Sequence, residues 1–420
     1  MIGRKIFVGL VWFGLVGPVI GGQRVVLVGN GLGERMNAYG FFETEAQLRH
    51  AKDQLFIRNM RHAAITPAFR PHPSRKTQWA FPGAEQLRPE FNRHSGVGHY
   101  PYPDEWLKTL KPDLIVALFG FNESFDGPEG VETFKKELDA FIQHTLSQNY
   151  NGTAPPKLIL VSPIAFEDLS RTYDLPNGQR ENANLAIYTD AMQRVAEQHE
   201  LPFVDLFTPT LAWFAEAEAP LTVNGCHLNE AGYRKLAPFL ADAVFGKQPV
   251  EEKHRERVHE LVQEKNWLWM NDYQMLNGVH VYGRRYKPYG NVNYPDEIAK
   301  IREMTEVRER AIWAALKGED YDVTGMDRKT RPLKPIKTNA EGRRKNQYIF
   351  DDAALQKIQV AEGYKVEQFA SSEEFKDLAN PVQMSFDNQG RLWIATMPSY
   401  PHYRPGDAKP EDKILILEDT

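Results

Sequence analysis

Four short segments carry residue types that could bind a small molecule or move a proton, and three of them follow an apolar run. The segments are Gly29-Asn30-Gly31-Leu32, Ala63-Ala64, Gly120-Phe121-Asn122-Glu123 and Asn224-Gly225-Cys226-His227. Histidine can exchange a proton near neutral pH, and amide groups can stabilise negative charge that develops on an oxygen. These residue types are suited to proton transfer or to the binding of a polar ligand.

The elements that must position these segments follow from the pattern of apolar residues. Continuous β-rich runs occupy residues 25–28, 55–57, 114–119, 158–161 and 203–206, and helical patterns such as 130–146 and 184–199 lie between them. This alternation predicts a parallel sheet with helices on both faces, a three-layer α/β/α sandwich. Because ligands bind beyond the carboxyl ends of such strands, we expect Gly31, Asn122 and His227 to converge at one sheet edge.

The order of the segments resembles that of the SGNH (GDSL-type) hydrolases. That family has Gly-Asp-Ser-Leu after the first strand, a glycine after the second, Gly-x-Asn-Asp after the third and Asp-x-x-His before the last helix. Here Gly120 and Asn122 match the third block, and His227 with its His-Leu-Asn-Glu-Ala-Gly-Tyr continuation matches the last. The resemblance implies an ester hydrolase in which His227 is the base, Asn224 orients it and Asn122 stabilises the oxyanion.

Several residues depart from the family pattern. The nucleophilic serine is replaced by Gly31, the aspartate before it by Asn30, the glycine of the second block by Ala64, and the orienting aspartate by Asn224. Glycine has no side chain that could attack an ester, so the family mechanism is not available as written. Two hypotheses follow: a hydrolase that uses water activated by His227 or by a carboxylate such as Glu34 or Glu123, or a catalytically silent glycan-binding or scaffold module.

The predicted site has catalytic and substrate-binding groups. We predict catalytic roles for His227, Asn122 and Asn224, and contact with a small-molecule or carbohydrate ester by Asn30, Gly31, Gly120, Glu34 and Arg35. Other interpretations stay open from the sequence alone. His227 could cap the following helix, and Asn122 could hold a loop. Gly31 could provide a turn that needs positive φ. Glu34 and Arg35 could form an ordinary ion pair, and Cys226 could be a small buried residue.

Composition excludes several other functions. The chain has 420 residues, 42% of them hydrophobic and 25% charged, and a net charge of −5 without a basic stripe. Nucleic acid is therefore not expected as a partner. Because Cys226 is the only cysteine, the sequence predicts neither a disulfide framework nor a thiolate metal cluster, and we expect no metal and no cofactor.

The first residues resemble an export signal. Arg4 and Lys5 precede a mostly apolar stretch over residues 6–20, and Gly21 and Gly22 follow it. This pattern predicts a cleaved signal peptide over residues 1–22 and a periplasmic or extracellular location. An uncleaved segment would give peripheral membrane association, and a buried first strand is a further alternative.

The remainder of the chain divides by composition. We predict the hydrolase-like domain over residues 23–316, with a solvated charged helix at 251–266 and a helix at 298–315 that packs on the sandwich. A polar linker, or alternatively a membrane-surface patch, occupies 317–347. Residues 348–420 are predicted to form a partial all-β, propeller-like segment, with strands at 364–369, 382–386, 392–395 and 414–417 and a turn at 387–390.

A more specific resemblance covers nearly the whole chain. The Gly-Asn-Gly-Leu-Gly-Glu-Arg-Met start, the Phe-Arg-Pro-His-Pro-Ser-Arg segment and the propeller-like tail are similar to large exported proteins of planctomycetes. Those proteins join an SGNH-like domain to a dehydrogenase-like β-propeller and a haem-binding Cys-x-x-Cys-His module. The motif does not occur in residues 1–420, so a redox role would rest on partner modules alone. The sequence is expected to be a fragment of such a protein.

Overall fold

Five short strands form one parallel sheet, as the alternating pattern predicts. The computed structural model describes residues 22–91, 96–250, 252–275, 277–338, 349, 351–399 and 403–418. The strands are β1 Arg24–Gly29, β2 Phe56–Asn59, β3 Leu114–Leu118, β4 Lys157–Val161 and β5 Phe203–Val204, and their order is β2-β1-β3-β4-β5. Strand β2 lies on one side of β1, and β3 lies on the other. The carboxyl ends of β1 and β3 therefore flank the topological switch point of the sheet.

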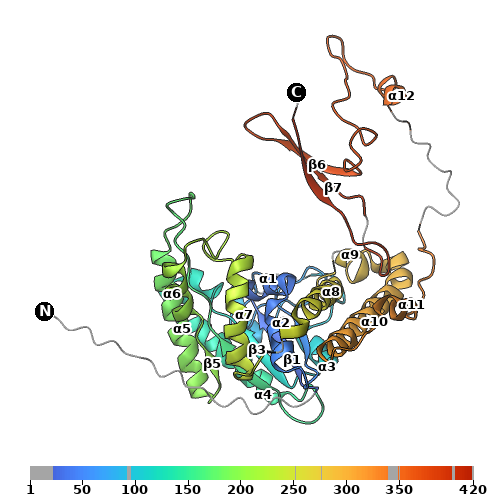
Figure 1. Ribbon diagram of the computed structural model, residues 1–420. Coiled ribbons are helices and arrows are strands. Elements are labelled where there is room, and N and C mark those ends of the chain that lie inside the picture. The colour runs from blue at the N-terminus through green and yellow to red at the C-terminus, as the bar shows by residue number, and fades with distance from the viewer. Residues whose placement is uncertain are drawn as a thin grey trace. The chain divides into compact units, whose positions relative to one another are not determined.

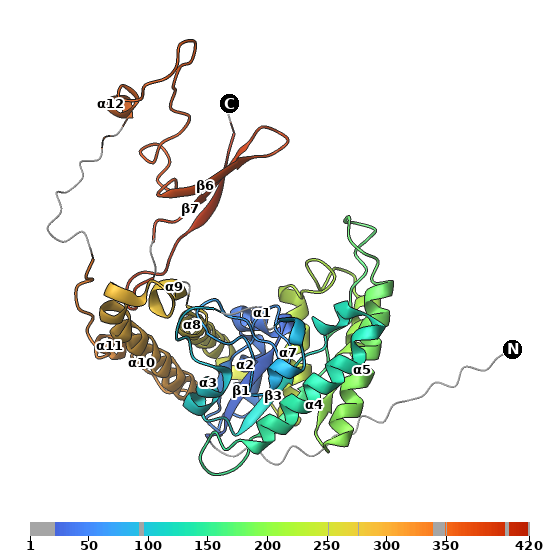
Figure 2. The same cartoon turned by 180° about the vertical axis from the view of Figure 1, so that it is seen from behind.

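Helices cover both faces of this sheet. Figure 1 shows α1 (Gly31–Tyr39), α2 (Phe41–Arg49), α7 (Glu230–Phe245) and α8 (Arg255–Tyr273) on one side. Figure 2 shows α4 (Val131–Ser147) and α5 (Gln179–Gln198) on the opposite side. The remaining helices of this region are α3 Pro103–Leu110, α6 Phe207–Glu216, α9 Gly278–Val281, α10 Asn291–Leu316 and α11 Val323–Arg328. The predicted three-layer arrangement is confirmed for the described residues.

The core lies on both faces of the central strands. Side chains of β1 and β3 alternate between the two faces, which suits strands that are buried on each side. On one face, Val25, Leu27 and Val116 pack against apolar residues of α2 and α7, such as Ala46 and Leu240. This packing fixes the carboxyl ends of β1 and β3, where the candidate site begins.

Helix α8 is the largest departure from the sequence prediction. The charged segment 251–266 is predicted to be a solvated helix, but α8 is packed into the domain and buries Val258, Leu261 and Val262. Lys265 is fully buried and forms an ion pair with buried Glu43 of α2. The prediction is wrong because paired charges on one face can be buried together, and a charge pattern does not reveal that a partner exists.

Helix α10 packs its apolar stripe as predicted. Ile301, Met304, Val307, Ala311 and Ile312 are all buried. The predicted linker begins with short α11, which Asp322 caps by accepting a hydrogen bond from the Gly325 N–H. Of the predicted signal peptide, only Gly22 is among the described residues, and positions 339–347 of the predicted linker lie outside them.

The C-terminal residues contain a small antiparallel sheet. Its strands are β6 Pro381–Phe386, β7 Leu392–Thr396 and β8 Lys413–Leu417, in the order β6-β7-β8, and the short helix α12 covers Asp351–Leu355. The turn between β6 and β7 is confirmed, since the Asp387 N–H donates to the Arg391 carbonyl. The predicted strand at 364–369 is wrong, because these residues have no strand pairing. A propeller remains a prediction.

No helix within the described residues is both long enough and apolar enough to cross a lipid bilayer.

Candidate active site

Asn30 and Gly31 lie where β1 passes into α1. Asn30 has extended backbone at the N-cap, and Gly31 is the first residue of the helix. The φ angle of Gly31 is not positive, so the interpretation as a left-handed turn glycine is wrong. A Cβ atom at this position would lie 3.9 Å from His227 Nε2. The first and last blocks of the predicted site therefore meet.

His227 is oriented by the side chain of Asn224. The Asn224 Oδ1 atom accepts hydrogen bonds from the backbone N–H groups of Cys226 at 3.4 Å and His227 at 3.1 Å. Because backbone N–H groups only donate, this atom must be the amide oxygen rather than the nitrogen. The same oxygen lies 3.0 Å from His227 Nδ1, so Nδ1 carries the proton and donates it. The lone pair of the neutral ring is therefore on Nε2, the atom nearest Gly31.

His227 is neutral at physiological pH. Burial lowers the pKa of His227, the nearby positive charge of Arg35 lowers it further, and Glu34 opposes the shift. A lowered pKa leaves the imidazole unprotonated around pH 7, which a general base requires. The alternative role as a helix cap is wrong, because Asn229 caps α7 by accepting from the Gly232 N–H.

The loops after β2 and β3 are joined by Asn122. Its Nδ2 donates to the carbonyl of Ile65 at 2.9 Å, which confirms that Asn122 holds a loop and leaves its second amide hydrogen available. Gly120 has φ +97°, a conformation that favours glycine. Ala64 has φ +59°, so it keeps a left-handed backbone where the family pattern has glycine.

Glu34 and Arg35 occupy the first turns of α1. Glu34 accepts a hydrogen bond from the Ala63 N–H at 2.9 Å and one from the side chain of Gln274 at 3.4 Å. No contact found in the described part of the chain pairs Glu34 with Arg35, so that interpretation is not supported. Arg35 is half-buried and stands four residues after Gly31, on the same helix face.

A small pocket lies between these loops. Its volume is about 10 Å³, close to what one water molecule needs. The lining residues are Asn30, Gly31, Leu32, Leu118, Phe119, Phe121, Ser162, Pro163, Ile164, Cys226 and His227. The sequence prediction missed Ser162 and Phe121, although both follow strands whose carboxyl ends reach this edge. The Ser162 hydroxyl donates to the Pro163 carbonyl and accepts from the Leu206 N–H, so it is a structural group.

Comparison with protein families supports an SGNH-type hydrolase domain. Residues 68–235 match the GDSL-like lipase/acylhydrolase family. The parallel five-stranded sheet between helices is consistent with the SGNH α/β/α fold. Residues 351–420 match a separate domain family of unknown function. No curated protein matches the chain.

Several solved structures show a distant likeness to part of the chain. LAE5, an α/β hydrolase from the metagenome of Lake Arreo, is 18% identical over 55% of this chain and 98% of its own, with a TM-score of 0.37. A putative GDSL-like lipase from Parabacteroides merdae is 17% identical over 55% and 100%, with a TM-score of 0.40. Axe2, an acetylxylan esterase from Geobacillus stearothermophilus, is 14% identical over 56% and 100%, with a TM-score of 0.39.

Cys226 lies against the ring of its sequence neighbour, His227. Its Sγ is 3.2 Å from His227 Nδ1, a contact between sequence neighbours that the sequence analysis did not expect. Burial raises the pKa of the Cys226 thiol, so it stays protonated at neutral pH. It also faces Nδ1 rather than the free Nε2. Cys226 is therefore not placed as the nucleophile. Within the described residues, no group of three or more His, Cys, Asp or Glu side chains is placed to hold a metal ion.

Glu123 connects the first and third blocks from inside the domain. Its Oε2 accepts hydrogen bonds from the Gly120 N–H at 2.8 Å and from Asn30 Nδ2 at 3.1 Å. Burial raises the pKa of Glu123 to about 8. The buried carboxyl group does not line the pocket at Gly31, so it is not placed to take a proton from water there. The structure assigns Glu123 a positioning role and removes it as a candidate base.

The Glu123→Gln variant is expected to make the protein less sensitive to alkaline pH. The folded-state pKa of Glu123 lies above its unfolded value, so wild-type stability falls as pH rises from about 4.5 to about 8. Within that window each pH unit costs the folded state up to about 1.4 kcal/mol. Glutamine keeps the acceptor for the Gly120 N–H and has no proton to lose. Urea unfolding at pH 5 and pH 9 should show a smaller loss in the variant, and an equal loss would contradict the assignment.

Proposed function

We propose that the GDSL-like domain hydrolyses the acetyl ester of a carbohydrate, with water activated by His227 in place of the serine hydroxyl. The observation that carries this proposal is the position of His227 Nε2, the ring atom with the lone pair. It lies 3.9 Å from the point that a Cβ atom at position 31 would occupy. In this position a water molecule could occupy the place of the family serine. The pocket volume of about 10 Å³ leaves room for about one such water molecule.

The proposed reaction has two steps. In the first, the water oxygen forms a bond to the acyl carbon while His227 Nε2 takes the water proton, which gives a tetrahedral oxyanion and an imidazolium. In the second, the bond from the acyl carbon to the alcohol oxygen breaks, and the imidazolium returns its proton to that oxygen. Asn224 is neutral, so it holds the tautomer but adds no charge to stabilise the imidazolium. A slow esterase is therefore expected.

Two groups are proposed to support the oxyanion. The N–H of Gly31 belongs to the first turn of α1, where backbone donors have no acceptor within the helix. The second amide hydrogen of Asn122 is not used by its bond to Ile65. Both residues come soon after a strand of the sheet, Gly31 at the start of α1 and Asn122 in the loop after β3, so the protein holds these donors independently of the substrate. Arg35, one turn after Gly31, is proposed to contact the alcohol part of the ester.

The second candidate is a glycan-binding module without turnover. The absence of a hydroxyl at Gly31 and of a carboxylate at Asn224 favours it. In that case the same pocket would hold a carbohydrate for another domain of a larger redox or propeller protein. For either function we propose export to the periplasm or the outside of the cell, based on the apolar segment at residues 6–20.

The two candidates are separated by acetate release from acetylated xylo-oligosaccharides. Wild-type protein should release acetate above the rate in buffer, and His227→Ala should reduce release to that background. The matched control is His199→Ala, since His199 is another half-buried histidine and pairs with Asp139 away from the pocket. Equal release by wild type and His227→Ala would reject hydrolysis and favour the binding module.

The pH profile of hydrolysis tests the electrostatics around His227. Arg35 lowers the pKa of His227, so Arg35→Gln should raise that pKa and move the acid limb of kcat to higher pH. Glu34→Gln should move the limb in the opposite direction, because Glu34 raises the pKa. NMR titration of the His227 ring provides the same comparison without catalysis. A limb that does not move in either variant would show that another group controls activity.

A further inference from the structure

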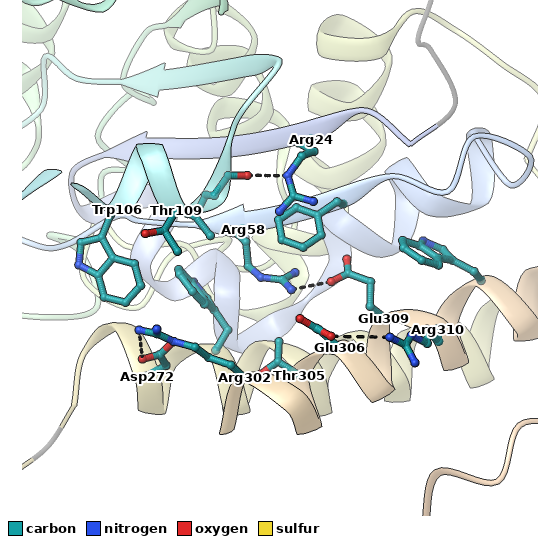
Figure 3. A pocket seen from close by; sticks show the side chains of 14 residues that line it. Arg24, Arg58, Trp106, Thr109, Asp272, Arg302, Thr305, Glu306, Glu309 and Arg310 are labelled. Atoms are coloured by element: carbon teal, nitrogen blue, oxygen red, sulfur yellow. Dashed lines mark hydrogen bonds and ion pairs between the residues drawn. The ribbon is translucent and has the colours of Figure 1, made fainter. Parts of the chain in front are cut away.

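A second cavity lies at the other edge of the sheet, where β1 and β2 begin. Its volume is about 310 Å³, near the lower end of the range of roughly 300–1,000 Å³ for small-molecule sites. Strand residues Arg24, Phe56 and Arg58 form one wall, and α3, α8 and α10 form the others (Figure 3). The lining side chains of these helices include Trp106, Thr109, Trp269, Asp272, Arg302 and Trp313. The cavity is separate from the pocket at Gly31, which lies at the carboxyl ends of the strands.

Three of the four arginines that line this cavity are paired with carboxylates, and the fourth, Arg24, donates its Nε–H to the Leu110 carbonyl and covers the Phe56 ring. Arg58 pairs with Glu309 at 2.5 Å, and Arg302 pairs with Asp272 at 2.7 Å. At the rim, Arg310 and Glu306 are 3.7 Å apart. A phosphate or another strong anion would have to compete with these carboxylates. The wall therefore favours a neutral ligand.

Two buried polar atoms in the wall have no partner within the described residues. Glu309 is 3% exposed, and its Oε1 accepts no hydrogen bond. Figure 3 shows that this oxygen points away from Arg58, while the other oxygen meets the guanidinium. Trp106 is 2% exposed, and its Nε1–H has no acceptor. An unpaired buried polar atom costs about 1–3 kcal/mol, so a ligand that donates to Glu309 Oε1 would recover part of that cost.

Aromatic rings supply the apolar part of the wall. Phe56 is already covered by guanidinium groups, with Arg24 at 3.6 Å and Arg58 at 3.9 Å from its ring centroid. Trp313 is half-buried at the rim, and no cation lies over its ring among the described contacts. The face of Trp313 is thus the aromatic surface best placed to stack on a ligand. A quaternary cation would need several uncovered rings, which the described wall does not offer.

We propose that this cavity binds a neutral saccharide unit and forms a carbohydrate site apart from the His227 pocket. A sugar hydroxyl can donate to Glu309 Oε1, the unpartnered acceptor in the wall. The C–H face of a sugar ring is flat and apolar enough to stack on Trp313. The volume suits about one sugar residue, with a longer chain leaving through the open side. The proposal concerns binding alone and does not depend on ester hydrolysis.

Titration of the full chain with unacetylated xylotriose and cellotriose tests this site. Calorimetry should show saturable binding of at least one of the two sugars. Trp313→Ala should weaken it about tenfold, as truncation of an aromatic anchor commonly does. The matched control is Trp213→Ala, a half-buried tryptophan that packs against Phe239 of α7. His227→Ala should bind as wild type, which separates this site from the proposed active site.

A rim variant keeps the test decisive if Trp313→Ala fails to fold. Thr109 lines the cavity and is exposed, so Thr109→Trp should block entry without disturbing the core, and it should weaken binding as strongly. The proposal is overturned if neither sugar saturates, if His227→Ala removes binding, or if the folded rim and Trp313 variants bind as wild type. Preferential binding of inorganic phosphate or indole at this cavity would also overturn it.

Discussion

The double variant Gly31→Ser/Asn224→Asp is expected to hydrolyse p-nitrophenyl acetate at least about 100-fold faster than the parent. The Cβ of a serine at position 31 would lie 3.9 Å from His227 Nε2. Its hydroxyl oxygen, one bond further on, can then reach Nε2 with a hydrogen bond. Aspartate can accept the contacts that Asn224 Oδ1 accepts now, and it adds a negative charge that stabilises the imidazolium. Each single change should give a small part of the gain, because these groups act as a unit.

The local backbone favours this result. The φ angle of Gly31 is not in the left-handed region, so a serine there carries no strain of that kind. Gly31→Ala/Asn224→Asp is the matched control, because it adds the Cβ without the hydroxyl. Thermal melting should first establish that all variants fold. A folded double variant that is no faster than the control would mean that the pocket has diverged further, and would favour the glycan-binding function.

The Lys265→Met variant is expected to lose about 3–5 kcal/mol of unfolding free energy. Lys265 is fully buried, pairs with Glu43 and also donates to the Ile57 carbonyl at 3.0 Å. Methionine fills a similar volume but leaves the Glu43 carboxylate without its cation. Burial already raises the pKa of Glu43, and loss of the neighbouring cation should raise it further. Urea unfolding followed by circular dichroism measures the loss.

Two comparisons isolate the charge effect. Lys253→Met makes the same change at an exposed position just before α8, and its effect should lie within about 0.5 kcal/mol of zero. Glu43→Gln/Lys265→Met removes both charges and should be more stable than Lys265→Met alone. If Lys265→Met unfolds like the Lys253→Met control, α8 does not form the buried face that the structure gives it.

The sequence by itself determined the sheet and the two ends of the site. Continuous apolar runs can be buried only between helices, so residues 25–28, 114–119 and 158–161 had to become central strands of a parallel sheet. The spacing from Asn224 to His227 lies within one loop, and local geometry was enough to make the amide a partner of the ring. The same local reasoning predicted the turn between β6 and β7.

Only the tertiary structure decided which polar groups are buried and what they meet. Lys265 and Glu43 are 222 positions apart, and the sequence of α8 contains nothing that distinguishes its buried lysine from a solvated one. Glu123 resembles a candidate base until its burial beside Asn30 raises its pKa to about 8. The cavity at Trp313 likewise joins a strand edge to three helices. Desolvation and charge pairing depend on distances between segments far apart in the chain, and a sequence pattern records only spacing along it.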